Sequence, residues 1–154
     1  MKNFKVVLFF MAILNGGMIH AQTFKVLKAT KQPWSGGVAG HYGADYDIEL
    51  ETSLHTIVPD TMWINDNVYP LSFSTPNNEC KRTVDSVTHR IKYSISATEA
   101  HDEMRSRSPN EPAAPKSKYA RHFQGAGMIS YQKKHKQYFF IIKSFTVLDA
   151  INYP

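Results

Sequence analysis

Residues 44–52, "ADYDIELET", decide the fold class, because acidic and apolar side chains alternate there without interruption. Successive side chains of a β-strand point to opposite faces of the sheet, so Tyr46, Ile48 and Leu50 share one face. The acids between them share the other face. The pattern is typical of an antiparallel strand with one buried side and one side in solvent. The four acids are Asp45, Asp47, Glu49 and Glu51.

The same period of two residues recurs along the chain, whereas a helical period is almost absent. Residues 85–97 alternate in this way, and their outward side chains include Arg90 and Lys92, which can pair with the acids of 44–52 across strands. Further strands are predicted over residues 23–30 and 125–132. On the buried side of 85–97 we expect Val87, His89, Ile91, Tyr93 and Ile95.

Two hairpins are predicted from turn residues. Asn65, Asp66 and Asn67 suit a tight turn between strands over 60–66 and 67–73. Pro70 lacks an amide hydrogen, which predicts that the second arm lies at a sheet edge or a bulge. The polar turn "KKHKQ" similarly separates 125–132 from residues 138–148, "YFFIIKSFTVL". Residues 138–148 are almost entirely apolar, which favours a central strand covered on both faces.

These elements predict an all-β protein of six or seven strands, an antiparallel, immunoglobulin-like β-sandwich, with a small closed β-barrel as the second choice. Residues 98–123 contain three prolines and many charges, so we expect a long surface loop with one helical turn near 99–104. Cys80 is the only cysteine and lies in a polar stretch, which predicts a loop thiol without a disulfide partner.

The first 21 residues have the order of a secretory signal peptide. Lys2 and Lys5 precede an uncharged apolar run over 6–14, and Ala21 ends a segment of small and polar residues. Cleavage there leaves a single domain of residues 22–154, and the formal net charge falls from +5 to +3. That charge is too small to indicate nucleic-acid binding. We therefore expect a protein of the periplasm or the cell exterior, without a transmembrane segment after cleavage.

The glycines of "SGGVAGHYG", residues 35–43, do not match a phosphate-binding motif. Their spacing differs from G-x-G-x-x-G, a strand follows instead of a helix, and Asp45 would repel a phosphate. The simpler interpretation is a turn that feeds the strand at 44–52, with Trp34 at one end of the core. Residues 28–50, "KATKQPWSGGVAGHYGADYDIEL", together with the closing "FTVLDAINYP", resemble small exported proteins of the Bacteroidota. The resemblance implies an exported β-rich fold and no assigned activity.

The sequence offers no catalytic, cofactor or metal motif. The six histidines after residue 21 show no paired ligand spacing, and G-x-S-x-G is absent. The charged side chains of "EAHDE", residues 99–103, could form a weak cation site, but the preferred interpretation is that they are simply solvated. From residue 104 to 143 there are nine basic residues and one acid, with tyrosines among them. Such a surface can hold an anionic glycan, a lipid A-type headgroup or nucleic acid, while a plain solubility surface is the preferred interpretation. The predicted contacts are Lys116, Lys118, Tyr119, Arg121, Lys133, Lys134 and Lys136.

The function predicted from the sequence is an exported, non-catalytic binding or structural module of the bacterial envelope. Its partner would be an anionic glycan or another envelope protein. A small exported hydrolase and a lipocalin-like carrier of an apolar ligand are the alternatives. A hydrolase requires polar side chains that converge in a cleft, and a carrier requires a closed barrel with an empty apolar interior.

Overall fold

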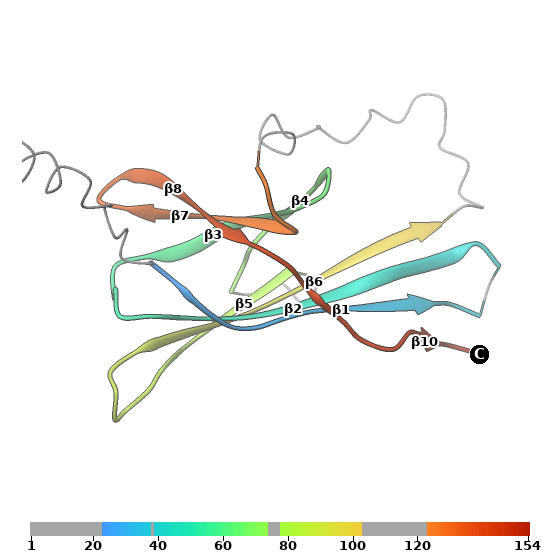
Figure 1. Ribbon diagram of the computed structural model, residues 1–154, viewed down its shortest axis with the longest axis horizontal. Helices are drawn as coiled ribbons and strands as arrows, with labels where there is room; N and C mark the ends of the chain where they lie inside the picture. The colour runs from blue at the N-terminus through green and yellow to red at the C-terminus, as the bar shows by residue number, and fades with distance from the viewer. Residues whose placement is uncertain (1–22, 38, 74–77, 103–122) are drawn as a thin grey trace, which may run out of the picture.

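The computed structural model describes residues 23–37, 39–73, 78–102 and 123–154, which form two β-sheets (Figure 1). The strands are β1 (Lys25–Ser35), β2 (His41–Thr52), β3 (Val58–Ile64), β4 (Asn67–Pro70), β5 (Asn78–Val84), β6 (Ile91–Asp102), β7 (Gly127–Lys133), β8 (Lys136–Ile142), β9 (Thr146–Val147) and β10 (Ile151–Asn152). No helix occurs in these ranges. The prediction of an all-β protein is confirmed.

The larger sheet has the order β10-β1-β2-β6-β5, with the short β9 also paired to β1, and the smaller sheet has the order β4-β3-β7-β8. Long strands pair antiparallel, while β9 and β10 run parallel to β1. Both sheets are open paths across the described residues, so the second choice of a closed barrel is wrong. The chain changes sheets after β2, β4, β6 and β8.

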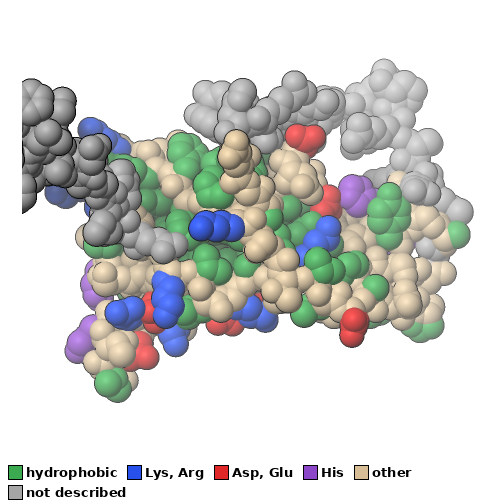
Figure 2. Space-filling model, in the orientation of Figure 1, with side chains coloured by type: hydrophobic (Ala, Val, Ile, Leu, Met, Phe, Trp, Pro, Cys, Tyr) green, Lys and Arg blue, Asp and Glu red, His purple; other side chains and the backbone are tan. Residues whose placement is uncertain are grey.

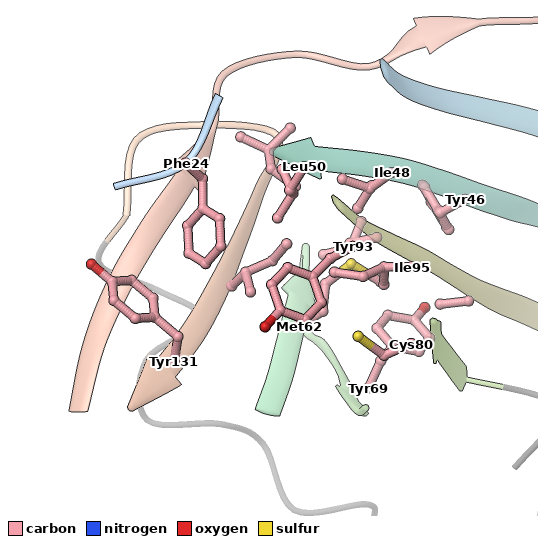
Figure 3. Packing of buried hydrophobic residues seen from close by; sticks show 14 of the residues in the cluster. Phe24, Tyr46, Ile48, Leu50, Met62, Tyr69, Cys80, Tyr93, Ile95 and Tyr131 are labelled. Atoms are coloured by element: carbon pink, nitrogen blue, oxygen red, sulfur yellow. The ribbon is translucent and has the colours of Figure 1, made fainter. Parts of the chain in front are cut away.

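One hydrophobic core takes side chains from both sheets (Figure 3). Tyr46, Ile48 and Leu50 of β2 are at most 1 % exposed, which confirms the face that the alternation predicts. Phe24, just before β1, packs edge-on against Tyr131 of β7 with ring centroids 5.1 Å apart. The core therefore fills the space between the sheets with aromatic and branched side chains.

Strand β6 confirms part of the prediction for residues 85–97. Ile91, Tyr93 and Ile95 are buried, and the Tyr93 hydroxyl donates a hydrogen bond of 2.5 Å to the carbonyl of Ile57. Val87 and His89 are not on the buried side: Val87 is 85 % exposed and His89 has a φ of 53°. Both lie at the tip of the β5–β6 hairpin, outside either strand.

The hairpin tip is organised by Asp85. The amides of Val87 and Thr88 donate to one oxygen of its carboxylate, at 2.9 and 2.8 Å. These hydrogen bonds stabilise the charged form and hold the pKa of Asp85 below its ordinary value. A turn closed by its own aspartate gives its side chains no fixed sheet face, which is why the predicted alternation ends at Ile91.

Strand β6 also continues further than predicted. Residues 98–102, expected in the loop and partly in a helical turn, are paired with β2 up to Asp102 opposite His41. Residues 103–122 of the predicted loop lie outside the described residues. The β3–β4 hairpin is confirmed, with Asn65 at a φ of 52°. Pro70 is in β4, an edge strand of the smaller sheet, as predicted.

The apolar run 138–148 is not one central strand. Strand β8 ends at Ile142 and forms an edge of the smaller sheet, where Phe139 is 40 % exposed. The chain then crosses to the larger sheet, and β9 pairs with β1. Phe145, in the crossing segment, packs against the ring of Tyr46 with centroids 5.3 Å apart. Within the run only Ile142 is buried, and Phe140 and Phe145 pack against the core.

Cys80 is a core residue and not a loop thiol. It lies in β5, is fully buried and carries no disulfide. Burial raises the pKa of its thiol to about 12, because the thiolate would lose its hydration. The thiolate is the reactive form of cysteine, so the fold protects Cys80 from oxidation and from disulfide exchange.

A search for membrane-spanning helices gives none in the part of the chain that the structure describes.

Candidate ligand pocket

An open pocket of about 410 Å³ lies on the outer face of the larger sheet, opposite the core. It is at the end of the molecule where the β1–β2 turn and the C-terminus meet (Figure 1). We call it the Trp34 pocket. Its lining residues are Trp34, Gly36, His41, Asp45, Thr98 and Tyr153.

The pocket floor depends on a glycine of β2. Trp34 and Gly43 are register partners in the β1–β2 pair, and the indole lies over the backbone of Gly43. A side chain at this position would overlap the carbonyl oxygen of Glu99 and would lie 2.5 Å from Cζ2 of Trp34. Gly43 is therefore required for close approach of a ring and a backbone, while Gly40, with a φ of 80°, is required for the turn.

The aromatic wall is built from both ends of the chain. The rings of Trp34 and His41 meet at 66° with centroids 5.3 Å apart. Tyr153 follows β10, and its amide donates a hydrogen bond of 2.9 Å to the carbonyl of Ser35. The hydroxyl of Ser35 also lies 2.6 Å from the side-chain oxygen of Asn152. The C-terminal segment is thus attached to β1 through the side chain of Asn152 and the amide of Tyr153.

Asp45 supplies the acidic group of the pocket. The Thr98 hydroxyl donates to one oxygen of its carboxylate at 2.8 Å. Two residues further along β2, Ser96 donates to Asp47 at 2.9 Å in the same way. An ionised carboxylate can accept about four hydrogen bonds, so one bond from Thr98 leaves Asp45 with capacity for a ligand.

Cross-strand pairing of the acids with basic residues is confirmed at one position. Arg90 pairs with Glu51 at 2.7 Å, although the register partner of Glu51 is Lys92. The acids nearer the pocket, Asp45 and Asp47, have hydroxyl partners instead. The negative charge of Glu51, at one end of the outer face of β2, is therefore neutralised by Arg90. The outer face stays negatively charged at the pocket end, where Asp45 and Asp47 lie.

A second polar cluster lies on the opposite face of the same sheet end, between the two sheets. The carboxylate of Glu99 is 15 % exposed and accepts hydrogen bonds from the Tyr46 hydroxyl at 2.8 Å and the Asn67 amide at 2.6 Å. His101 Nε2 lies 3.1 Å from it. Glu99 therefore links β2 and β6 of the larger sheet with β4 of the smaller one.

Two tyrosines beside Glu99 stay protonated. Burial and, as the second largest cause, the hydrogen bond to Glu99 raise the pKa of Tyr46. Burial and the Glu99 charge raise the pKa of Tyr69 to about 12. The Tyr69 hydroxyl is buried and has no hydrogen-bond partner among the described residues. The cluster is a structural link between the sheets, with both phenols neutral at ordinary pH.

The sequence placed Glu99, His101 and Asp102 together as a possible cation site on a loop. They belong instead to strand β6, where Asp102 faces away from the other two because the residues alternate. Glu103 lies outside the described residues. No group of three or more histidine, cysteine or acidic side chains that fits a metal ion is found within the described ranges.

Only part of the predicted basic surface lies among the described residues. Lys133, Lys134 and Lys136 lie at the β7–β8 turn, where Lys134 has a φ of 49°. This turn is at the opposite end of the molecule from the Trp34 pocket (Figure 1). Basic side chains on the face shown in Figure 2 are interspersed with acidic and apolar ones. Outside the described residues lie Lys116, Lys118, Tyr119 and Arg121.

No family model, curated protein or solved structure matches this chain. The resemblance to exported proteins of the Bacteroidota therefore stays an expectation from the sequence.

Proposed function

We propose that the protein is an exported, non-catalytic binding module built on an immunoglobulin-like β-sandwich, and that the Trp34 pocket is its binding site. The strand order supports the sandwich. If the first eight strands are named A, B, C, C′, D, E, F and G, the sheets read A-B-E-D and C′-C-F-G. This is the arrangement of immunoglobulin domains, with one C′ strand added. The added feature is the C-terminal segment, which returns to β1.

The observation that carries the binding proposal is the composition of the pocket. Trp34 and Tyr153 supply aromatic surface, and Asp45 and Thr98 supply a small number of polar groups. Ligand sites in proteins typically combine an apolar wall with a few polar groups that fix orientation. Tyr153 is 52 % exposed, and an exposed aromatic residue beside a carboxylate has surface to offer a ligand.

Binding is favoured over hydrolysis by the partners of the polar groups. A hydroxyl nucleophile requires a base, most often an imidazole, within hydrogen-bond reach. The Thr98 hydroxyl donates to the carboxylate of Asp45, and a carboxylate is a weaker base than an imidazole, while the ring of His41 packs against Trp34. A carrier is disfavoured because the sheets are open and side chains from both fill the space between them. Export is supported by Lys2 and Lys5 before the apolar run 6–14.

A fragment screen by ¹⁵N NMR on the purified protein tests the pocket. We expect at least one class of fragment to shift the signals of Trp34, Thr98 and Tyr153, and Trp34→Ala to abolish those shifts. Lys133→Glu at the opposite end is the control and should leave them unchanged. If the fragments shift only the NMR signals of other residues, the proposal is contradicted. Expression with residues 1–21 included tests export, since recovery of only the unprocessed chain inside the cell would contradict it.

A further inference from the structure

We propose that the Trp34 pocket recognises an organic ammonium group, held by aromatic contact with Trp34 and Tyr153 and by the charge of Asp45. The inference rests on the pocket being the binding site and adds the chemical class of its ligand. Among the described residues, three aromatic rings and one acid line the pocket, and no lysine or arginine does.

The described lining residues favour a cation by the sign of their charge. Asp45 is the one carboxylate among the described lining residues, and Asp47 follows two residues later on the same face of β2. Lys31, on the neighbouring strand, points to the other face of the sheet, where its Nζ lies 5.6 Å from the centroid of the Tyr46 ring. An anionic ligand would meet the Asp45 carboxylate in this pocket, whereas a cation would be attracted to it.

The aromatic wall of the pocket also favours a cation. The faces of tryptophan and tyrosine rings carry negative potential and attract a cation within about 6 Å of the ring centroid. Trp34 is held in place by its close approach to the backbone of Gly43 and by its contact with the ring of His41. A ring fixed in this way loses little conformational freedom on binding, which increases affinity.

A sugar also stacks on aromatic rings, but the polar groups of the pocket disfavour it. A sugar has hydroxyls around its rim and needs several hydrogen-bond partners. The pocket offers Asp45, Thr98 and His41, and the Thr98 hydroxyl hydrogen is directed to Asp45. An ammonium group that bears alkyl substituents needs one carboxylate and an apolar wall, which is what the lining residues supply.

The test is a titration of the purified protein with choline, followed by the NMR signals of the pocket. We expect saturable shifts with a dissociation constant on the order of millimolar, because the pocket is open and the ligand small. The uncharged analogue 3,3-dimethylbutan-1-ol should bind about tenfold more weakly or worse, since it keeps the shape of choline without the charge. Nα-acetyl-lysine amide, titrated in parallel, distinguishes a free quaternary ammonium from a lysine side chain.

Two matched variants identify the contact. Asp45→Asn keeps an oxygen that can accept from Thr98 and removes the charge, so choline binding should weaken about tenfold. Asp47→Asn makes the same change two residues away, beside Ser96, and should change affinity less than about twofold. Equal losses in the two variants would indicate a diffuse surface effect and would overturn the proposed contact.

The outcomes separate this inference from the function on which it rests. If the neutral analogue binds as tightly as choline, or if a methyl glycoside shifts the pocket signals and choline does not, the ammonium inference fails and the pocket stands as a binding site. If neither these probes nor the fragment library shift the pocket signals, the proposed function fails as well.

Discussion

Replacing Tyr93 with alanine should lower the free energy of unfolding by about 3–5 kcal/mol, a large fraction of the total of a domain this size. Tyr93 is fully buried in the core that both sheets share. The substitution leaves a cavity and also leaves the carbonyl of Ile57 without the hydroxyl that donates to it at 2.5 Å. Equilibrium unfolding in urea, followed by circular dichroism, measures the loss.

Two further substitutions divide this effect into its causes. Tyr93→Phe keeps most of the ring volume and removes only the hydrogen bond, so it should cost about 1–2 kcal/mol. Val87→Ala, at the exposed tip of the hairpin that leads into the same strand, should change stability by less than about 0.5 kcal/mol. A Tyr93→Ala protein no less stable than Val87→Ala would mean that the sheets do not share a core at this position.

Gly43→Ala should both destabilise the protein and deform the Trp34 pocket. An added methyl group would overlap the carbonyl of Glu99 and lie 2.5 Å from the ring of Trp34, so both the β2–β6 pairing and the indole must adjust. Overpacking of this kind typically costs about 1–3 kcal/mol. We expect that loss in urea unfolding, together with at least a fivefold fall in the affinity of any pocket ligand, on the order expected from a ring displaced by about 1 Å.

Gly127→Ala is the matched control, because Gly127 also lies in a strand. There the nearest atom to an added Cβ is the carbonyl oxygen of Trp63, at 3.3 Å. The neighbours must shift only slightly, and alanine loses less conformational entropy than glycine on folding. We expect a small change in stability and no change in pocket affinity. If Gly43→Ala behaves like this control, the close approach of Trp34 to β2 is not needed for the pocket.

The sequence predicted the buried and exposed faces well for strands that have a neighbouring strand on both sides in the sheet. In β2 and in the first half of β6, alternation identified Tyr46, Ile48 and Tyr93 as core residues, because one side of the sheet is packed and the other is not. Alternation was misleading at Val87, since a hairpin tip has no sheet face. It was uninformative in β5, where Cys80 is the one buried residue of an otherwise polar edge strand.

The route of the C-terminal segment was not predictable from the pattern. An apolar run such as 138–148 predicts burial, but within it only Ile142 is buried, and Phe140 and Phe145 pack against the core while Val147 is exposed. The pattern also does not show that the run contributes to both sheets. Strand β10 has two residues, too few for any period. Trp34 and the glycine stretch drew attention in the sequence, but nothing in the pattern placed Tyr153 beside them. The pocket exists because segments from the two ends of the chain pair in parallel.

The most direct test of this account is hydrogen exchange at the amides of Leu148 and Tyr153. Leu148 donates to the carbonyl of Lys31 and Tyr153 to that of Ser35, each at 2.9 Å, and these bonds hold the C-terminal segment on β1. We predict that both amides exchange at least about a hundredfold more slowly than in an unstructured chain. Exchange at the unstructured rate at both positions would contradict the account, because the segment that carries Tyr153 would then not complete the pocket.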